Sequence, residues 1–552
     1  MRSLSNSPTR NDLIIACALA ALASFLVFPH LGTQALWQDE GQTAVVAQNV
    51  LRTGLPLASD GKNLVSIFSD RRDIRDGIYI WQPFAPVYAA AASMAIAGQN
   101  AAGARLPFAL AFVLLVGLTY WIVLYWGDNR QAALVTATLM AGSVVLLLHA
   151  RQCRYYVLAP LLNLLIVHAY LLLRVKPRLT VLVWLVIWST LLINSFFPGA
   201  LTLALGIAID CLIRKPGMKT WTQLCIAAAI VALINLPMAI FLRIWSRPFG
   251  VQPGYSSFEV FFLYLVRYLL TINLYFFPLV LFIAAAVIVM RKSRTPMRRE
   301  NGMAVCFCVI CLSQLLGFSL ISDYPFTRYM IGLAPFLFYL GAISIQRITA
   351  GRALILWPLS IVLICTNWAG VLLTFPARDF VEDVQWTTAG IDGRFLRPGQ
   401  VGVSYAKGEI ATIIREGFGS PLLNYGRSIV HPPQGPIDAV LDVLNKEARP
   451  SDVVKIAYED LSLMFHTDLK IVSASTVGPA APDWIIQRHL AKLRVDPDFV
   501  SETKRFQYAE KTLQVPDVEW NNQPDPIYHF YQELPAGIAP GLRMFKKPRA
   551  DK

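Results

Sequence analysis

The chain has 552 residues, of which 55% are apolar, 11% are aromatic and only 15% are charged. Soluble proteins carry about 25% charged residues, so this composition excludes a disordered chain, a disulfide-built secreted domain and an ordinary soluble enzyme. The mean hydropathy of +0.49 agrees. Together these values indicate a polytopic membrane protein.

The charge distribution divides the chain near Pro376. Residues 376–552 contain 21 Lys+Arg and 23 Asp+Glu, a net charge of −2, whereas the first 375 residues contain 28 basic and 12 acidic residues, a net charge of +16. The basic excess lies in short loops between apolar runs, where it orients membrane spans and implies no nucleic-acid partner. We therefore expect a transmembrane module over 1–375 and an extracytoplasmic soluble domain over 376–552.

Apolar runs of span length, about 17–25 residues, predict the transmembrane helices. They give about eleven: 12–31 (a retained signal anchor), 105–126, 132–149, 155–173, 180–196, 198–213, 221–242, 271–290, 303–321, 329–346 and 353–373. The run 84–98 is shorter, since a helix of 15 residues reaches about 22 Å and the hydrocarbon core is about 30 Å thick. We predict that 84–98 is a juxtamembrane helix at the outer surface.

Loop charges then fix the predicted orientation. If 84–98 does not cross, Arg2 and Arg10 fall on the same side as four later basic clusters, as the positive-inside rule requires. The clusters are Arg174/Lys176/Arg178, Arg214/Lys215/Lys219, Arg291/Lys292/Arg294/Arg298/Arg299 and Arg347/Arg352. The prediction is a multi-pass protein of the bacterial cytoplasmic membrane, with a cytoplasmic N-terminus and the C-terminal domain outside.

The first outer loop, about 32–104, is the long loop of the membrane module and the main candidate for a site. It carries six of the twelve acidic residues of this module: Asp39, Glu40, Asp60, Asp70, Asp73 and Asp76. The adjacent pair Asp39-Glu40 precedes an amphipathic-looking stretch, and one interpretation is that the pair only caps that helix. The other is a carboxylate suited to deprotonate an acceptor hydroxyl or to hold a divalent cation (Mg, Mn or Ca).

Arginines in other outer turns suggest an anion. The turn HARQCRYYVL, residues 149–158, has two arginines on the side that usually carries few. A loop carboxylate balances them, or a ligand phosphate, to which arginine donates two parallel hydrogen bonds. His149 is interpreted as a polar helix end rather than a metal ligand.

A later turn, SDYPFTRYMIGLAP (322–335), places Arg328 and Tyr329 at the start of another span. Asp323 is a candidate ion-pair partner of Arg328. Arg243, Arg247 and Glu259 occupy the loop 243–260, which belongs to the same predicted outer rim. Carboxylates in one outer loop thus face arginines in three others.

Four stretches with this order and sidedness resemble a known family. They are WQDEGQTAVVAQNVLRTG (37–54), GARLPFALAFVLLVGLTYWI (103–122), ARQCRYYVL (150–158) and TRYMIGLAPFLFYLGA (327–342). Over about 340 residues the chain looks like a GT-C-fold membrane glycosyltransferase. It is most similar to the family-39, aminoarabinose-transferase-like group, which includes the protein O-mannosyltransferases.

The resemblance implies a hexosyl- or pentosyltransferase that takes its sugar from a polyprenyl phosphate on the outer face, with inversion at the anomeric carbon. Its acceptor would be a glycan, lipid or protein, and membrane lipids would surround it. Carried over by residue, Asp39 would be the general base or would organise it, with Glu40 beside it. Arg154 and Arg328 would hold the lipid phosphate, helped by Tyr156 and Tyr329, with Arg151 as a further candidate.

One element departs from the family pattern. The aminoarabinose transferases have Glu-Lys-Pro-Pro-Leu where this chain reads Trp81-Gln82-Pro83-Phe84-Ala85. Because the acid and the lysine are both missing, the departure argues against aminoarabinose transfer and against a family-like metal site there. The remaining metal candidates are Asp39, Asp73 and Asp76.

The C-terminal part alternates β-like and helix-like runs. The β-like runs are QVGVSY (400–405), VVKIAY (453–458) and LKIVSA (469–474), and GEIATIIREGF and PIDAVLDVLNKEA read as helices. This pattern predicts a small α/β domain, with HPPQGP (431–436) as a turn and a tail from about 516 that wraps its surface. A lid or acceptor platform and a mere scaffold both fit such a domain.

Two other classes of function remain open from the sequence. A flippase or transporter of lipid-linked glycans would place polar groups near the bilayer midplane and often has related halves. This chain has few charges inside its spans and no half-to-half similarity. An inactive assembly subunit is the third reading, and the Asp39-Glu40 pair weighs against it.

Overall fold

A computed structural model describes residues 9–67, 71–243, 257–291, 299–322, 325–366, 369–370, 420–432, 434–456, 458–473, 482–487, 503–516 and 541–548. The chain forms two compact units. The bundle unit comprises Met1–Val27, Ala109–Ala150 and Tyr155–Asn424. The loop-and-sheet unit comprises Phe28–Phe108, Arg151–Arg154 and Tyr425–Lys552. The first outer loop therefore belongs with the C-terminal domain rather than with the helices that flank it in sequence.

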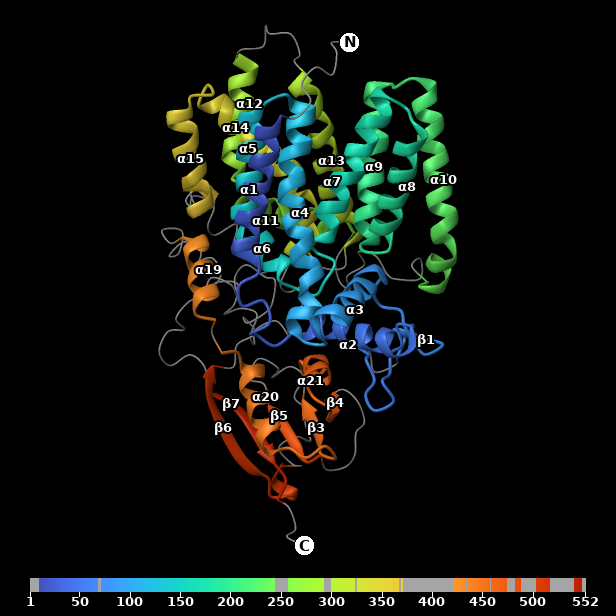
Figure 1. The fold of residues 1–552 in the computed structure, drawn as a ribbon, viewed down its shortest axis with the longest axis vertical. Coiled ribbons are helices and arrows are strands. Elements are labelled where there is room, and N and C mark those ends of the chain that lie inside the picture. Colours follow the sequence, from blue (N-terminus) through green and yellow to red (C-terminus); the bar gives the residue numbers. More distant parts are fainter. Residues whose placement is uncertain are drawn as a thin grey trace. The chain divides into compact units, whose positions relative to one another are not determined.

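The bundle unit is helical (Figure 1). Its elements are α1 (Arg10–Val27), α4 (Ala101–Gly127, whose first turns belong to the loop-and-sheet unit), α5 (Arg130–Gly142), α6 (Val144–Ala150), α7 (Leu158–Val175), α8 (Leu179–Ile193), α9 (Phe197–Arg214), α10 (Met218–Phe241), α11 (Ser257–Thr271), η2 (Ile272–Phe276), α12 (Leu279–Arg291), α13 (Arg299–Ile321), η3 (Thr327–Leu333), α14 (Ala334–Ile348) and α15 (Ala353–Cys365).

Among the described residues, eight helices are long and apolar enough to cross a membrane, or nine if the bent pair α5–α6 counts as one span. All eleven predicted spans fall on helices of the bundle. Three of those helices (α8, α12 and α15) are shorter than a full crossing. The multi-pass α-helical architecture is confirmed, and the count of eleven stays a prediction.

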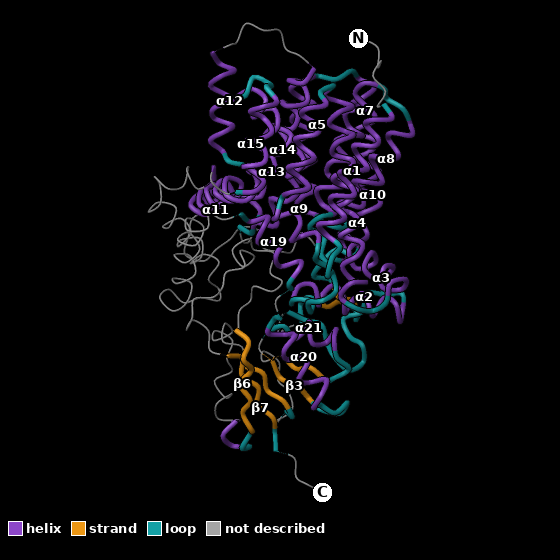
Figure 2. The backbone as a smooth tube through the Cα atoms, turned by 60° about the vertical axis from the view of Figure 1, so that its left-hand side comes forward, coloured by secondary structure: helices purple, strands orange, loops and turns teal. Residues whose placement is uncertain are grey.

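Residues 257–290 differ from the prediction. We expected a loop over 243–260 and one span over 271–290, but α11 already begins at Ser257 and the helical chain breaks before Pro278. Proline lacks the N–H that a helix interior needs, so it divides the run. Figure 2 shows α11 running across the direction of α12 and α13.

Within the bundle unit, the turn between α9 and α10 lies at the end where α1 begins (Figure 1). Arg214 ends α9, Lys215 lies in the turn and Lys219 is in the first turn of α10. This placement agrees with the predicted common side of the N-terminus and the basic clusters. Sidedness relative to a membrane remains a prediction.

The topology prediction is tested at Gln99, which follows α3 (Ala85–Ala97). That helix has 13 residues, or about 20 Å of length, so it should not cross. A Gln99→Cys variant should react with an impermeant thiol reagent from outside the cell, in a background without the exposed native Cys17, Cys225 and Cys308. Lys176→Cys is the control that should react only after permeabilisation. Labelling of the Gln99→Cys variant only after permeabilisation would reject the topology.

In the loop-and-sheet unit, α2 (Gln38–Thr53) packs against α3. Glu40 accepts the main-chain N–H of Trp37 at the start of α2, and Gly54 ends the helix in the left-handed conformation, with φ of +78°, which suits a residue without a Cβ. A short hairpin, β1 (Ile74–Arg75) and β2 (Ile78–Tyr79), lies between the two helices in sequence.

The C-terminal domain contains a five-stranded sheet of order β4-β3-β5-β7-β6. The strands are β3 (Val453–Ile456), β4 (Lys470–Ser473), β5 (Trp484–Gln487), β6 (Ala509–Pro516) and β7 (Gly541–Lys546). Strands β4, β3 and β5 are parallel, and β7 and β6 pair antiparallel. The helices are α19 (Pro421–Val430), α20 (Pro436–Glu447) and α21 (Asp460–His466).

The α/β prediction is confirmed by β3, β4 and α20, and one detail is wrong. Part of the predicted wrapping tail, Gly541–Lys546, is strand β7 inside the sheet, between β5 and β6. The runs 400–405 and 408–418 lie outside the described residues, as do 517–540 and Pro433 of the predicted turn.

Candidate functional site

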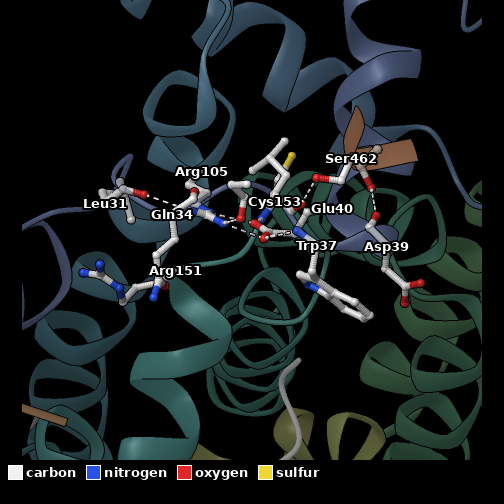
Figure 3. A network of polar contacts seen from close by, with 12 residues as sticks. Leu31, Gln34, Trp37, Asp39, Glu40, Arg105, Arg151, Cys153 and Ser462 are labelled. Carbon is white, nitrogen blue, oxygen red and sulfur yellow. Dashed lines mark hydrogen bonds and ion pairs between the residues drawn. The ribbon is translucent and has the colours of Figure 1, made fainter. Parts of the chain in front are cut away.

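The Asp39-Glu40 pair lies in the first turn of α2, with Trp37 at the N-cap position. Glu40 closes the capping interaction, so the cap interpretation holds for this residue. The Asp39 side chain is 26% exposed, and Figure 3 shows it pointing away from the Arg105 guanidinium. The two adjacent acids therefore occupy different environments.

Glu40 is fully buried and joins three segments of the chain (Figure 3). Its Oε1 accepts from Arg105 Nε and from the main-chain N–H of Cys153, both at 2.8 Å. Its Oε2 accepts from Arg105 Nη2 at 2.7 Å. Arg105, 4% exposed, also donates to three main-chain carbonyls, those of Leu31, Gln34 and Ala35. This saturated ion pair fixes the start of α2 against the turn 151–154.

Cys153 lies next to this pair and is buried. Burial, together with the nearby Glu40 carboxylate, raises the pKa of the Cys153 thiol well above its usual value. The thiol is therefore protonated and acts as a small packing group. What the turn contributes to the Glu40 cluster is the main-chain N–H of this residue.

Arg154 follows Cys153 directly and reaches the next turn of α2. Its Nη2 lies 3.6 Å from Asp39 Oδ2, and its Nη1 donates to Gln42 Oε1 at 3.0 Å and to Gln82 Oε1 at 2.5 Å. Thr43 Oγ1 accepts from the same nitrogen at 3.1 Å. The predicted base and the first predicted phosphate ligand are therefore neighbours in one unit.

Arg151 has a different environment from Arg154. Its guanidinium donates to the main-chain carbonyls of Pro29 at 2.7 Å and His30 at 2.9 Å, just past the end of α1. These bonds tie the turn 151–154 to the start of the outer loop. A phosphate-binding role for Arg151 stays a prediction.

Arg328 and its aromatic neighbours form a cluster in the bundle unit. Its Nη1 donates to the Tyr156 hydroxyl at 3.3 Å, and its guanidinium carbon lies 4.0 Å from the centre of the Phe326 ring. Tyr329 stacks on Phe196, with ring centres 5.8 Å apart. The sequence-predicted group Tyr156, Arg328 and Tyr329 is thus gathered in one place.

His149 packs edge-on against Tyr156, with ring centres 5.2 Å apart. Its Nδ1 lies 2.7 Å from the Val145 carbonyl of its own helix. Because a carbonyl only accepts, Nδ1 carries the proton. This geometry fits the predicted polar helix end.

The other loop carboxylates lie in different settings. Asp73 is buried and accepts from the Ser66 hydroxyl and the Ile67 N–H, each at 2.7 Å. Asp76 is 79% exposed and lies 3.7 Å from Arg75. Asp60 caps a turn by accepting the N–H groups of Lys62 and Asn63. Asp70 lies outside the described residues, as do Asp323 and Arg247.

The three metal candidates do not fit a common ion. Asp73 already holds two donors within its own loop, Asp76 lies on an exposed turn, and Asp39 lies beside a guanidinium. Within the described part of the chain, no three His, Cys, Asp or Glu residues gather as a metal site would require. We therefore derive no chemistry through a metal.

Several residues of the site carry no signal in the sequence that would have singled them out. Arg105 lies within an otherwise apolar run, and Gln42, Thr43 and Gln82 are uncharged. The only indication for Arg105 was its place in the family-like stretch 103–122. Gln82 occupies the element that departs from the aminoarabinose transferases, and its amide oxygen here accepts from Arg154 and Thr43.

Comparison with known proteins identifies solved structures with a similar fold. No family model matches the chain, and no curated protein sequence matches it. The crystal structure of ArnT from Cupriavidus metallidurans bound to undecaprenyl phosphate is similar, with a TM-score of 0.54, 14% identity, and coverage of 86% of this chain and 87% of that one. The apo structure of the same protein gives a TM-score of 0.53, 15% identity, and coverage of 90% and 91%.

A fainter similarity links the chain to the archaeal oligosaccharyltransferase AglB from Archaeoglobus fulgidus, with a TM-score of 0.42, 11% identity, and coverage of 84% of this chain and 64% of that one. The ArnT likeness spans nearly the whole of both chains, so the polytopic GT-C-like fold with its C-terminal domain is confirmed.

Proposed function

We propose that the chain is an integral-membrane glycosyltransferase that moves a sugar from a polyprenyl-phosphate donor to an envelope acceptor. The reaction takes place at the outer face of the bacterial cytoplasmic membrane, with inversion at the anomeric carbon. The observation that carries this proposal is the Asp39–Arg154 pair, a carboxylate 3.6 Å from a guanidinium. It occurs in a chain whose fold resembles that of an ArnT structure bound to undecaprenyl phosphate.

The Asp39 carboxylate suits the acceptor hydroxyl of a glycosyl transfer, and the Arg154 guanidinium suits the leaving phosphate. Asp39 takes the proton from the acceptor hydroxyl as its oxygen bonds to the anomeric carbon. The bond from that carbon to the phosphate oxygen breaks, and polyprenyl phosphate leaves. The phosphate gains negative charge during this step, and arginines placed in advance stabilise it. The lipid tail stays in the bilayer, which requires such a site to adjoin membrane helices.

Gln82 supports an anion beside Arg154. Its amide oxygen accepts from Arg154, so its NH2 group faces the other way, and this nitrogen is buried without a partner among the described residues. A buried donor without an acceptor is costly, and a phosphate oxygen would satisfy it. Arg328, with the Tyr156 hydroxyl, is the corresponding candidate in the bundle unit.

Replacing either arginine should weaken donor use. We expect Arg154→Ala and Arg328→Ala each to reduce transition-state stabilisation by about 1.5–3 kcal/mol, the value of hydrogen bonds to charged groups. The measurement is kcat/KM with the lipid-phosphate donor. Arg52→Ala, at the exposed far end of α2, is the matched control and should behave like the unaltered protein. A loss confined to one of the two arginines would mean that the other does not contact the donor phosphate.

The function itself is tested with the purified protein in lipid nanodiscs and labelled polyprenyl-phosphate sugars. Acceptor-dependent release of polyprenyl phosphate supports a transferase. Movement of intact lipid-linked sugar across a liposome membrane, without cleavage, would instead identify a flippase. Mass spectrometry of envelope glycans from cells with and without the gene would then name the sugar and the acceptor.

A further inference from the structure

The segment that leads into α2 is held by helices of the C-terminal domain. The main-chain N–H of Ala35 donates to Asp438 Oδ1 at 2.7 Å, and that of Leu36 donates to His466 Nε2 at 3.0 Å. The Ser462 hydroxyl donates to the Leu36 carbonyl. Two consecutive residues of the outer loop are thus bonded through their main chain to α20 and α21, more than 400 positions later in the sequence.

The contact continues into the first turn of α2. Gln38 Nε2 donates to Asp460 Oδ1 at 2.8 Å. Gly41 lies so close to α21 that a Cβ atom there would come within 2.6 Å of the Leu461 carbonyl carbon. No ordinary side chain fits at Gly41, so α21 packs directly on the helix that carries Asp39.

His466 is suited to accept a main-chain hydrogen bond. It is partly buried, and this burial together with the nearby Arg105 charge lowers the pKa of His466 to about 4. The ring is therefore neutral at physiological pH, and Nε2 has a lone pair for the Leu36 N–H. Leu36 is fully buried, so water does not easily reach its N–H to replace the bond.

These contacts control where Asp39 lies. Glu40 ties the start of α2 to the turn that carries Arg154, and its partner Arg105 donates to the Gln34 and Ala35 carbonyls. Residues 35–36 lead directly into α2, so the direction of this segment sets how the first turn of α2 is aimed. Three main-chain bonds fix that direction without contributing a group to the chemistry.

We propose that His466, Ser462 and Asp438 are positioning residues, through which the C-terminal domain holds Asp39 at its working distance from Arg154. The inference rests on the proposed function and assigns the domain a part in turnover beyond that of a cover or acceptor platform. A displacement of about 1 Å at a reacting group costs about 100-fold in rate. Losing one of these bonds should therefore affect kcat much more than KM.

The test is a pair of substitutions measured alone and together. His466→Leu should lower kcat about 10- to 100-fold, with KM for the labelled lipid-phosphate donor nearly unchanged. His466→Gln, whose amide oxygen can accept the Leu36 N–H, should recover much of the loss. In an Asp39→Asn background, His466→Leu should have little further effect, because the group that it positions is already inactive.

Two further variants keep the test decisive. Ser462→Ala removes only one hydroxyl, so it should preserve folding even if His466→Leu does not. It should lower kcat when Asp39 is present and have little further effect in the Asp39→Asn background. Glu447→Gln breaks ion pairs with Lys511 and Lys546 elsewhere in the same domain, and should leave kcat unchanged.

The outcomes distinguish failure of the positioning role from failure of the proposed function. Equal fold-losses from His466→Leu or Ser462→Ala with and without Asp39 would overturn the positioning role, and so would unchanged kcat in both variants. These results would leave the proposed transferase intact. Near-normal turnover of the Asp39→Asn variant would overturn both the positioning role and the assignment of the base.

Discussion

Asp39→Asn is expected to lower turnover by about two to four orders of magnitude, the range for lost general-base catalysis, while folding stays nearly unchanged. An amide keeps the shape of the carboxylate and its ability to accept hydrogen bonds, but it cannot take a proton from a hydroxyl. The Asp39 side chain is partly exposed, and the buried Arg154 keeps its hydrogen bonds to Gln42, Thr43 and Gln82 when the Asp39 charge is removed. The measurement is single-turnover release of labelled polyprenyl phosphate.

Thermal unfolding of the same preparation is the control. Asp39 lies in the first turn of α2, where a negative charge contributes only about 0.3–1 kcal/mol, so Asn there should change stability little. Near-normal transfer would mean that the base lies elsewhere. Asp60 and Asp76 would then be the next candidates to replace, followed by Asp70. Asp73 is the weakest of the loop acids, because it is buried and holds two donors of its own loop.

The membrane architecture was predictable because long apolar runs have few alternatives in a bilayer. The run 105–126 became the core of α4, and 303–321 became most of α13. The same reasoning missed the bend of 58° between α5 and α6, since both sides of it are equally apolar. It also missed α11, which together with η2 forms a helical stretch, Ser257–Phe276, that is itself long and apolar enough to cross a membrane.

The site was predictable only in part. Asp39 could be found because it belongs to an acidic pair in the long first loop, and Arg154 because arginines in its turn oppose the predicted charge bias. Glu40 was expected only to stand beside the base, and the sequence did not show that it is buried against Arg105, a residue 65 positions away. Residue type alone cannot separate two adjacent carboxylates, because the difference lies in what packs against each.

The role of the C-terminal domain lay beyond the sequence for a similar reason. Its contacts with Ala35 and Leu36 are made to main-chain atoms, which have no residue-specific pattern. Strand β7 was missed because it pairs with β5 and β6 at a large separation in sequence. The local sequence of Gly541–Lys546 does not indicate that this segment lies inside the sheet.

The buried ion pair between Glu40 and Arg105 leads to a second large effect, this time on folding. Both side chains are almost fully removed from solvent, and their oxygens and nitrogens are at 2.7–2.8 Å. Removing one partner of such a pair costs about 3–5 kcal/mol, because the other charge stays buried. Arg105→Met leaves the Glu40 carboxylate with only the N–H groups of Trp37 and Cys153.

Arg105→Met should therefore destabilise the loop-and-sheet unit by about 3–5 kcal/mol, more than Glu40→Gln, whose amide oxygen can still accept from the Cys153 N–H. The double variant Glu40→Gln/Arg105→Met removes both charges, so it should be less destabilised than the sum of the two single variants by about 0.5–3 kcal/mol. The measurement is denaturant unfolding of the protein in nanodiscs. Unfolding is detected by protease cleavage within the loop 32–104. Fully additive losses would show that the two charges do not interact, and that the start of α2 is held instead by the main-chain bonds of Ala35 and Leu36.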